Sequence, residues 1–138
     1  MDKIKLLNDL NKWMHHTMVS TIGIEITDVG DNFICGRMPV DERTIQPLGM
    51  LHGGASVTLA ESLGSVGGSL QIDSEKEVVM GIGINANHLN AVEKGWVIGK
   101  ATPIKVEKRI QVWQIKIENE KNKPVCISTL TLAVVQKR

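Results

Sequence analysis

The chain has 138 residues, a length typical of one domain, and 42% of its residues are hydrophobic. Lysine and arginine number 16 against 15 aspartates and glutamates, so the formal net charge is +1. This balance excludes an intrinsically disordered chain and argues against a surface that follows nucleic-acid phosphates. We therefore expect a single globular domain over residues 1–138.

The first part of the chain is predicted to form a helix, a hairpin and a loop. Apolar residues recur at helical spacing over residues 2–15 and predict an amphipathic helix. Two alternating runs, 23–28 and 32–40, flank a turn signal at residues 30–31 and predict a β-hairpin. Residues 41–52 contain proline and glycine and are expected to form a loop.

A long helix and four strands are expected in the rest of the chain. The helix should span about residues 53–71 and pack one apolar face on a sheet: Leu59, Leu63, Val66 and Leu70. Four later runs alternate in polarity and predict strands: 78–84, 96–104, 109–118 and 124–135. In the first of these, one face should hold Val78, Met80, Ile82 and Ile84. Because short turns join these strands, we expect an antiparallel sheet and the α+β class.

Residues 44–72 are unusual because Glu61 is their only formally charged side chain, although charged residues make up 22% of the chain. The helix face opposite the apolar stripe carries mainly small residues: Val57, Glu61, Gly64, Ser65 and Gly68. Such a face is not typical of a helix exposed to water. It favours close approach by a ligand or another backbone, and we interpret it as contact with a partner subunit.

Glu61 has two interpretations. It is either a carboxylate at the rim of an oligomer interface, or a general base or nucleophile kept in a partly dry site. Ser65 lies one helical turn further on, on the same face, within reach of Glu61 or of a water molecule that it holds. Alone, Ser65 is equally an ordinary small interface residue.

The expected helix begins with two glycines, Gly53 and Gly54, and His52 precedes it. Backbone N–H groups at a helix start have no helical partners. Glycine lets a ligand oxygen approach these groups, so the segment is a candidate oxyanion site as well as a simple N-cap. His52 and Glu61 lie about 13 Å apart along the helix and on roughly opposite sides. A site that used both would therefore need two subunits.

Weaker candidates lie elsewhere. Asn85 and Asn87 share a strand face with small residues, while the nearby His88 is most simply a structural or surface histidine. Lys108 and Arg109 lie at a strand connection that is either a solvated turn or a phosphate contact. The histidines and cysteines lack zinc-site spacing, so we expect no metal.

The N-terminal segment lacks the apolar core of a secretory signal, and no apolar run is long enough to span a membrane. Cys35 and Cys126 suggest reduced thiols rather than a disulfide framework. These features predict a cytoplasmic location.

Several runs of residues together resemble the hotdog-fold acyl-CoA thioesterases. They are 46–56 (QPLGMLHGGAS), 59–62 (LAES) with 64–65 (GS), 38–41 (MPVD), 84–88 (INANH) and 111–115 (QVWQI). The chain is most similar to the group with glutamate in the central helix. That group includes the 1,4-dihydroxy-2-naphthoyl-CoA thioesterase and the enterobactin-pathway proofreading thioesterase. The phenylacetate-pathway branch carries aspartate there, which places this chain outside it.

The resemblance implies a hotdog fold, with a curved sheet of about six strands around the helix, and homodimers that pair into tetramers. It implies hydrolysis of an acyl-CoA, with small aromatic acyl groups favoured, and a role in menaquinone biosynthesis. Glu61 would act as nucleophile or general base, and the Gly53 N–H would polarise the thioester carbonyl. Gln46 and His52 of the facing subunit would orient the thioester, and Ser65 would position water. The residues expected at the CoA moiety are His88, Asn90, Lys108 and Arg109. No metal or redox cofactor is implied.

Three alternatives remain open from the sequence. The same fold serves acyl-thioester dehydratases and isomerases, in which the acid acts on a carbon-bound proton. It also serves non-catalytic acyl-CoA-binding modules, although the sensors of that kind carry an attached DNA-binding region. A structural homo-oligomer is the third.

Overall fold

The computed structural model describes residues 2–138, and a long central helix organises its fold. The elements along the chain are α1 (Lys3–Trp13), α2 (Met18–Thr21), β1 (Glu25–Gly30), β2 (Phe33–Val40), α3 (Gly53–Ser69), β3 (Glu77–His88), β4 (Gly95–Val106), β5 (Ile110–Asn119) and β6 (Pro124–Gln136). The predicted α+β class is confirmed, and the long helix ends two residues earlier than expected. The short helix α2 was not predicted.

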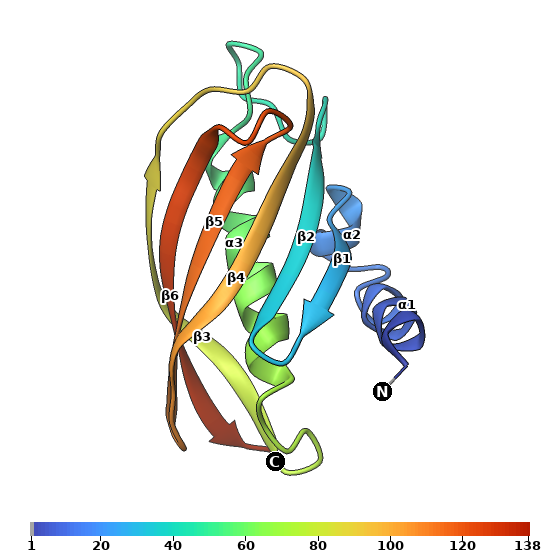
Figure 1. The fold of residues 1–138 in the computed structure, drawn as a ribbon, viewed down its shortest axis with the longest axis vertical. Helices are drawn as coiled ribbons and strands as arrows, with labels where there is room; N and C mark the ends of the chain where they lie inside the picture. Colours follow the sequence, from blue (N-terminus) through green and yellow to red (C-terminus); the bar gives the residue numbers. More distant parts are fainter. Residues whose placement is uncertain (1) are drawn as a thin grey trace.

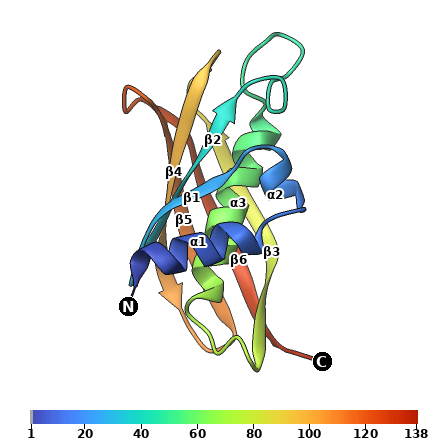
Figure 2. The same ribbon diagram turned by 90° about the vertical axis from the view of Figure 1, so that its right-hand side faces the viewer.

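All six strands join one antiparallel sheet in the order β1-β2-β4-β5-β6-β3. The sheet curves around α3, which runs alongside its concave face (Figure 1). From the side, α1, α2 and β1 lie nearest the viewer with α3 behind them (Figure 2). The central helix is thus covered by the sheet on one side and flanked by the N-terminal segment on the other.

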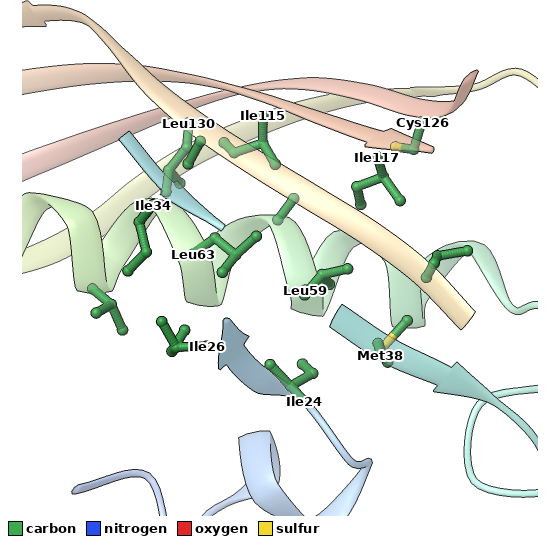
Figure 3. Packing of buried hydrophobic residues seen from close by; sticks show 14 of the residues in the cluster. Ile24, Ile26, Ile34, Met38, Leu59, Leu63, Ile115, Ile117, Cys126 and Leu130 are labelled. Atoms are coloured by element: carbon green, nitrogen blue, oxygen red, sulfur yellow. The ribbon is translucent and has the colours of Figure 1, made fainter. Parts of the chain in front are cut away.

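The core lies between α3 and the sheet. Leu59 and Leu63 are fully buried, and Figure 3 shows them among side chains of β2, β5 and β6. Leu70, at the helix C-terminus, is 40% exposed, so the expected apolar stripe holds except at this last position. Burial of this stripe is the main contribution of α3 to stability.

The outward orientation expected for Gly64 and Gly68 is wrong. A Cβ at Gly64 would lie 2.5 Å from the Leu130 side chain, and a Cβ at Gly68 would lie 2.5 Å from Leu132. Both glycines therefore press against β6, because the curved sheet encloses more of the helix than a flat sheet would. The glycines permit this close approach of helix and sheet.

The single face expected for Val78, Met80, Ile82 and Ile84 is also wrong. The pairing of β3 with β6 shifts between Gly81 and Gly83, as in a β-bulge. Val79 and Ile84 consequently both pack against the core, while Met80 and Ile82 are 55% and 61% exposed. The bulge inserts one residue into the alternation and changes which face the next side chains occupy.

Both cysteines lie on strands of the sheet, Cys35 on β2 and Cys126 on β6. Cys126 is buried, Cys35 is half-buried, and both thiols are free. Burial raises the pKa of the Cys126 thiol. None of the helices in residues 2–138 is both long and apolar enough to cross a membrane.

Candidate active site

Glu61 lies on α3 opposite the edge strand β3. Its Oε2 atom would be 2.8 Å from a Cβ at Gly81. Any other residue at position 81 would therefore displace the carboxylate from its present position. The Glu61 side chain is exposed. The partly dry environment expected for it is therefore not present in a single chain, because β3 is the last strand of the sheet and no further strand within residues 2–138 pairs with its free edge.

Glu61 and Ser65 open into one cavity of about 590 Å³ between the N-terminal segment and the central helix, here named the α1–α3 hollow. Most of its lining is apolar and includes Trp13, Met14, Met18, Val57 and Val66. Within residues 2–138, no hydrogen bond joins Glu61 to Ser65. The two side chains thus share a cavity one helical turn apart, as their spacing predicts.

At the start of α3, His52 acts as the N-cap. Its Nδ1 accepts a hydrogen bond from the Gly54 N–H at 2.7 Å, and its carbonyl oxygen accepts from the Ala55 N–H at 3.0 Å. Among the described residues, the Gly53 N–H has no such partner, so it remains available as a donor. Because Nδ1 accepts, the neutral imidazole carries its proton on Nε2 and can donate outward.

A second cavity of about 370 Å³ lies beside this helix end and is here named the N-terminal hollow. Its lining includes Gln46, Gly53, His88 and Asn90. His88 covers the helix start closely, since a Cβ at Gly53 would lie 2.9 Å from His88 Nε2. Asn90 is anchored by donating from Nδ2 to the Pro124 carbonyl at 2.7 Å. Four of the predicted site residues therefore converge on one hollow.

The loop that carries Gln46 is folded by its own hydrogen bonds. The Gln46 N–H donates to the Met50 carbonyl at 2.8 Å, and Gln46 Oε1 accepts from the Leu48 N–H. At the base of the loop, Thr44 is buried and its carbonyl accepts from the His52 N–H at 2.8 Å. This arrangement holds Gln46 and His52 in a defined relation to the helix start, while Leu48 at the tip is 80% exposed.

The structure does not bring all predicted residues together in one chain. Gly53 and Glu61 are separated by about 12 Å along α3 and open into different hollows. Lys108 and Arg109 lie in the turn between β4 and β5, at the opposite end of the sheet from His88 and Asn90 (Figure 1). A single chain therefore holds separate parts of the predicted site.

The sequence pattern did not mark Trp13 and Met18 as candidate site residues. They line the α1–α3 hollow with Glu61, although they come from a different part of the chain. Trp13 lies outside the apolar stripe of its helix, which is the one signal that marks it in the sequence. Its proximity to Glu61 depends on how α1 is placed, which a local pattern does not show.

Comparisons with known proteins agree with this geometry. The Thioesterase superfamily profile matches residues 48–126. The crystal structure of thioesterase HI1161 from Haemophilus influenzae superposes with a TM-score of 0.91 at 51% identity, over 94% of this chain and 90% of that chain. The chain is 46% identical over 129 residues to the 1,4-dihydroxy-2-naphthoyl-CoA hydrolase of Escherichia coli strain K12, covering 94% of each protein.

It is also 43% identical over 129 residues to the proofreading thioesterase EntH of Cronobacter turicensis, covering 94% of this chain and 93% of that protein. The sheet wrapped around one long helix is the hotdog fold of these thioesterases. The profile spans more than half of the chain, and the relatives match along almost all of it. The chain therefore belongs to the thioesterase superfamily and is a thioester hydrolase.

Proposed function

We propose that this thioesterase hydrolyses CoA thioesters of small aromatic acids, such as 1,4-dihydroxy-2-naphthoyl-CoA, with Glu61 as the reacting carboxylate. The observation that carries the proposal is the position of Glu61, in the lining of a largely apolar hollow and against a glycine of the edge strand. The name of the Escherichia coli relative supports the acyl group. The unpaired Gly53 N–H supports the polarisation of the carbonyl.

Two routes use the same residues. In one, the Glu61 carboxylate attacks the carbonyl carbon, the thiolate leaves and is protonated by solvent, and water hydrolyses the resulting anhydride. In the other, Glu61 takes a proton from a water molecule that attacks the carbonyl, and this proton passes to the departing thiolate. Both routes consume one water and yield a carboxylic acid and free CoA.

We further propose that two copies of the chain complete each site around a twofold axis. Within one chain, Glu61 and the Gly53 N–H open into different hollows. β3 is an edge strand with exposed Met80 and Ile82, and an unpaired, apolar edge is suited to pairing with another strand. Pairing of two β3 edges would cover Glu61 and bring the partner's Gln46, His52 and Gly53 toward it. Pairing of these dimers into tetramers would allow Lys108 and Arg109 of a further chain to reach the CoA moiety.

Release of free thiol from a panel of acyl-CoAs tests the reaction. We expect turnover with benzoyl-CoA and 1,4-dihydroxy-2-naphthoyl-CoA, and slower turnover with acetyl-CoA and palmitoyl-CoA. A thiol reagent in continuous absorbance measurements gives the rates. If no substrate releases thiol while the same substrates bind, the protein is an acyl-CoA-binding module and the proposal is wrong.

The pair Gly81→Ala and Gly83→Ala tests the position of the carboxylate. A Cβ at Gly81 would lie 2.8 Å from Glu61 Oε2, whereas a Cβ at Gly83 meets nothing within 4 Å. Displacing a reacting group by a fraction of an ångström should lower kcat by about tenfold in Gly81→Ala. Gly83→Ala makes the same chemical change two residues along the strand and should stay near wild type. Equal rates in both variants would contradict the assigned position.

A further inference from the structure

The α1–α3 hollow carries two large apolar side chains that the rest of the chain leaves uncovered. Trp13 is 64% exposed and Met18 is 63% exposed, and both line the same cavity of about 590 Å³. A volume of this size is typical of small-molecule sites and far exceeds the needs of an acetyl group. Exposed apolar side chains that gather around one cavity indicate a bound apolar group.

The two walls of the cavity come from different parts of the chain. Among the described residues that line it, Glu61 is the only ionisable one, and Ser65 lies next to it on α3. Trp13 and Met18 come from the opposite wall, formed by the N-terminal segment. An acyl thioester with its carbonyl at Glu61 would therefore direct the rest of its acyl group toward the indole and the thioether.

The wall that holds Trp13 is firmly anchored before any ligand binds. Asn11 Nδ2 donates to the Ile26 carbonyl at 2.9 Å, and the Ile26 N–H donates back to Asn11 Oδ1 at 2.8 Å. Met14, next to Trp13, is 5% exposed and belongs to the core. After the helix, Thr17 Oγ1 donates to the Met14 carbonyl at 2.6 Å. Because the backbone is fixed from both sides, binding of a ring requires adjustment of side chains only, which keeps its entropic cost small.

We infer that the α1–α3 hollow receives the acyl group of the substrate and that Trp13 is a specificity-determining residue, which selects flat aromatic acyl groups by stacking on them. This inference rests on the proposed function, since it assumes a thioester whose carbonyl lies at Glu61. An indole face favours an aromatic ring over an aliphatic chain of equal area, and the Met18 sulfur adds a favourable contact with the ring edge.

The test compares kcat/KM for benzoyl-CoA and acetyl-CoA in the wild type, Trp13→Ala and Trp13→Phe. In Trp13→Ala, the preference for benzoyl-CoA should fall about tenfold, mainly through KM, because the stacking contact exists in the bound substrate as well as in the transition state. Trp13→Phe keeps an aromatic face and should keep the preference within about twofold.

Trp96→Ala is the matched control for removal of an indole. Trp96 lies on β4, where it stacks against the Arg37 guanidinium 4.0 Å from the ring centre, and it lines neither hollow. Its substitution should leave the benzoyl preference unchanged. The inference is overturned if Trp13→Ala retains the preference. It is also overturned if Trp13→Ala loses oligomer mass in light scattering, since Trp13 would then be covered by a second copy of the chain.

A ligand that cannot be hydrolysed separates this inference from the proposed function. S-phenacyl-CoA places a phenyl ketone on a thioether and has no thioester bond to cleave. We expect calorimetry to show about tenfold weaker binding to Trp13→Ala than to the wild type. If the wild type cleaves no acyl-CoA but shows this difference in binding, the hydrolase proposal fails and the hollow assignment stands. If hydrolysis occurs and the two proteins bind S-phenacyl-CoA equally, the hollow assignment fails alone.

Discussion

Glu61→Gln should lower kcat for thioester hydrolysis by about 10²–10⁴-fold while leaving the fold and the oligomeric state unchanged. Glutamine occupies the volume of glutamate but neither accepts a proton nor attacks a carbonyl, so the substitution removes both routes at once. Because the Glu61 side chain is exposed and makes no hydrogen bond within the described residues, its loss should barely affect the thermal midpoint. Stopped thiol-release assays with benzoyl-CoA measure the rate.

Ser62→Ala is the matched control, because Ser62 neighbours Glu61 and lines the same hollow without an assigned role in the reaction. It should retain most of the wild-type kcat. Turnover by Glu61→Gln within a few-fold of the wild type would remove Glu61 from the mechanism. The alternative explanation of a low rate, a folding defect, is checked by circular dichroism and by binding of S-phenacyl-CoA.

Isotopic oxygen distinguishes the two roles of Glu61. If Glu61 is the nucleophile and water attacks the enzyme side of the anhydride, repeated turnover in H₂¹⁸O places ¹⁸O in its carboxylate, so labelled Glu61 identifies the nucleophilic route. If Glu61 is a general base, all the label enters the product acid. Mass spectrometry of the peptide that contains Glu61 provides the answer.

Two inactive variants should restore activity to one another when they assemble together. Glu61→Gln lacks the carboxylate, and His52→Asn lacks the outward Nε2–H while keeping a side-chain oxygen that can cap Gly54. Each variant alone should lose at least about 10²-fold in kcat. Given different tags and co-expressed in equal amounts, they should recover about a quarter of wild-type activity, since half of the randomly paired dimers are mixed and each of these holds one intact site out of two.

The matching experiment places both substitutions in the same chain. Co-expression of this double variant with the wild type yields mixed dimers in which each site contains at least one substitution, so their contribution should be negligible. Failure of the two single variants to restore one another, in mixtures whose mixed assembly is verified by the tags, would show that Glu61 and His52 of different subunits do not form one site. A monomer of 15.1 kDa in light scattering would contradict the shared site directly.

The start of α3 is a feature that local sequence is sufficient to predict. The His52-Gly53-Gly54 segment predicts a helix start with a free N–H, and the structure has the helix beginning at Gly53 with His52 as its cap. Capping depends on residues that are adjacent along the chain, so the sequence contains what is needed to predict it. The roles assigned to Gln46, His52 and Ser65 in the reaction stay predictions.

Features that depend on contacts between distant segments could not be predicted from the sequence. A helical pattern places Gly64 on the face opposite Leu63, but it contains nothing about the curvature of the sheet that encloses both. The bulge between Gly81 and Gly83 arises from the pairing of β3 with β6, so alternation within β3 alone wrongly places Ile84 on the same face as Met80 and Ile82. The short helix α2 depends on its placement against α3 and has too few residues for a periodic signal.

The residues on the two sides of α3 differ greatly in how well they tolerate substitution. This difference affects how such enzymes diversify. On the sheet side, an added methyl group at Gly64, Gly67 or Gly68 would meet a neighbour at 2.5–2.9 Å, so that side offers evolution almost no freedom. On the other side, Trp13 and Met18 of the peripheral N-terminal segment line the α1–α3 hollow and are largely exposed, so a different residue there costs the fold little. With the role proposed for Trp13, lineages that inherit this scaffold can acquire new substrates by altering the N-terminal segment while α3 and its packing stay fixed.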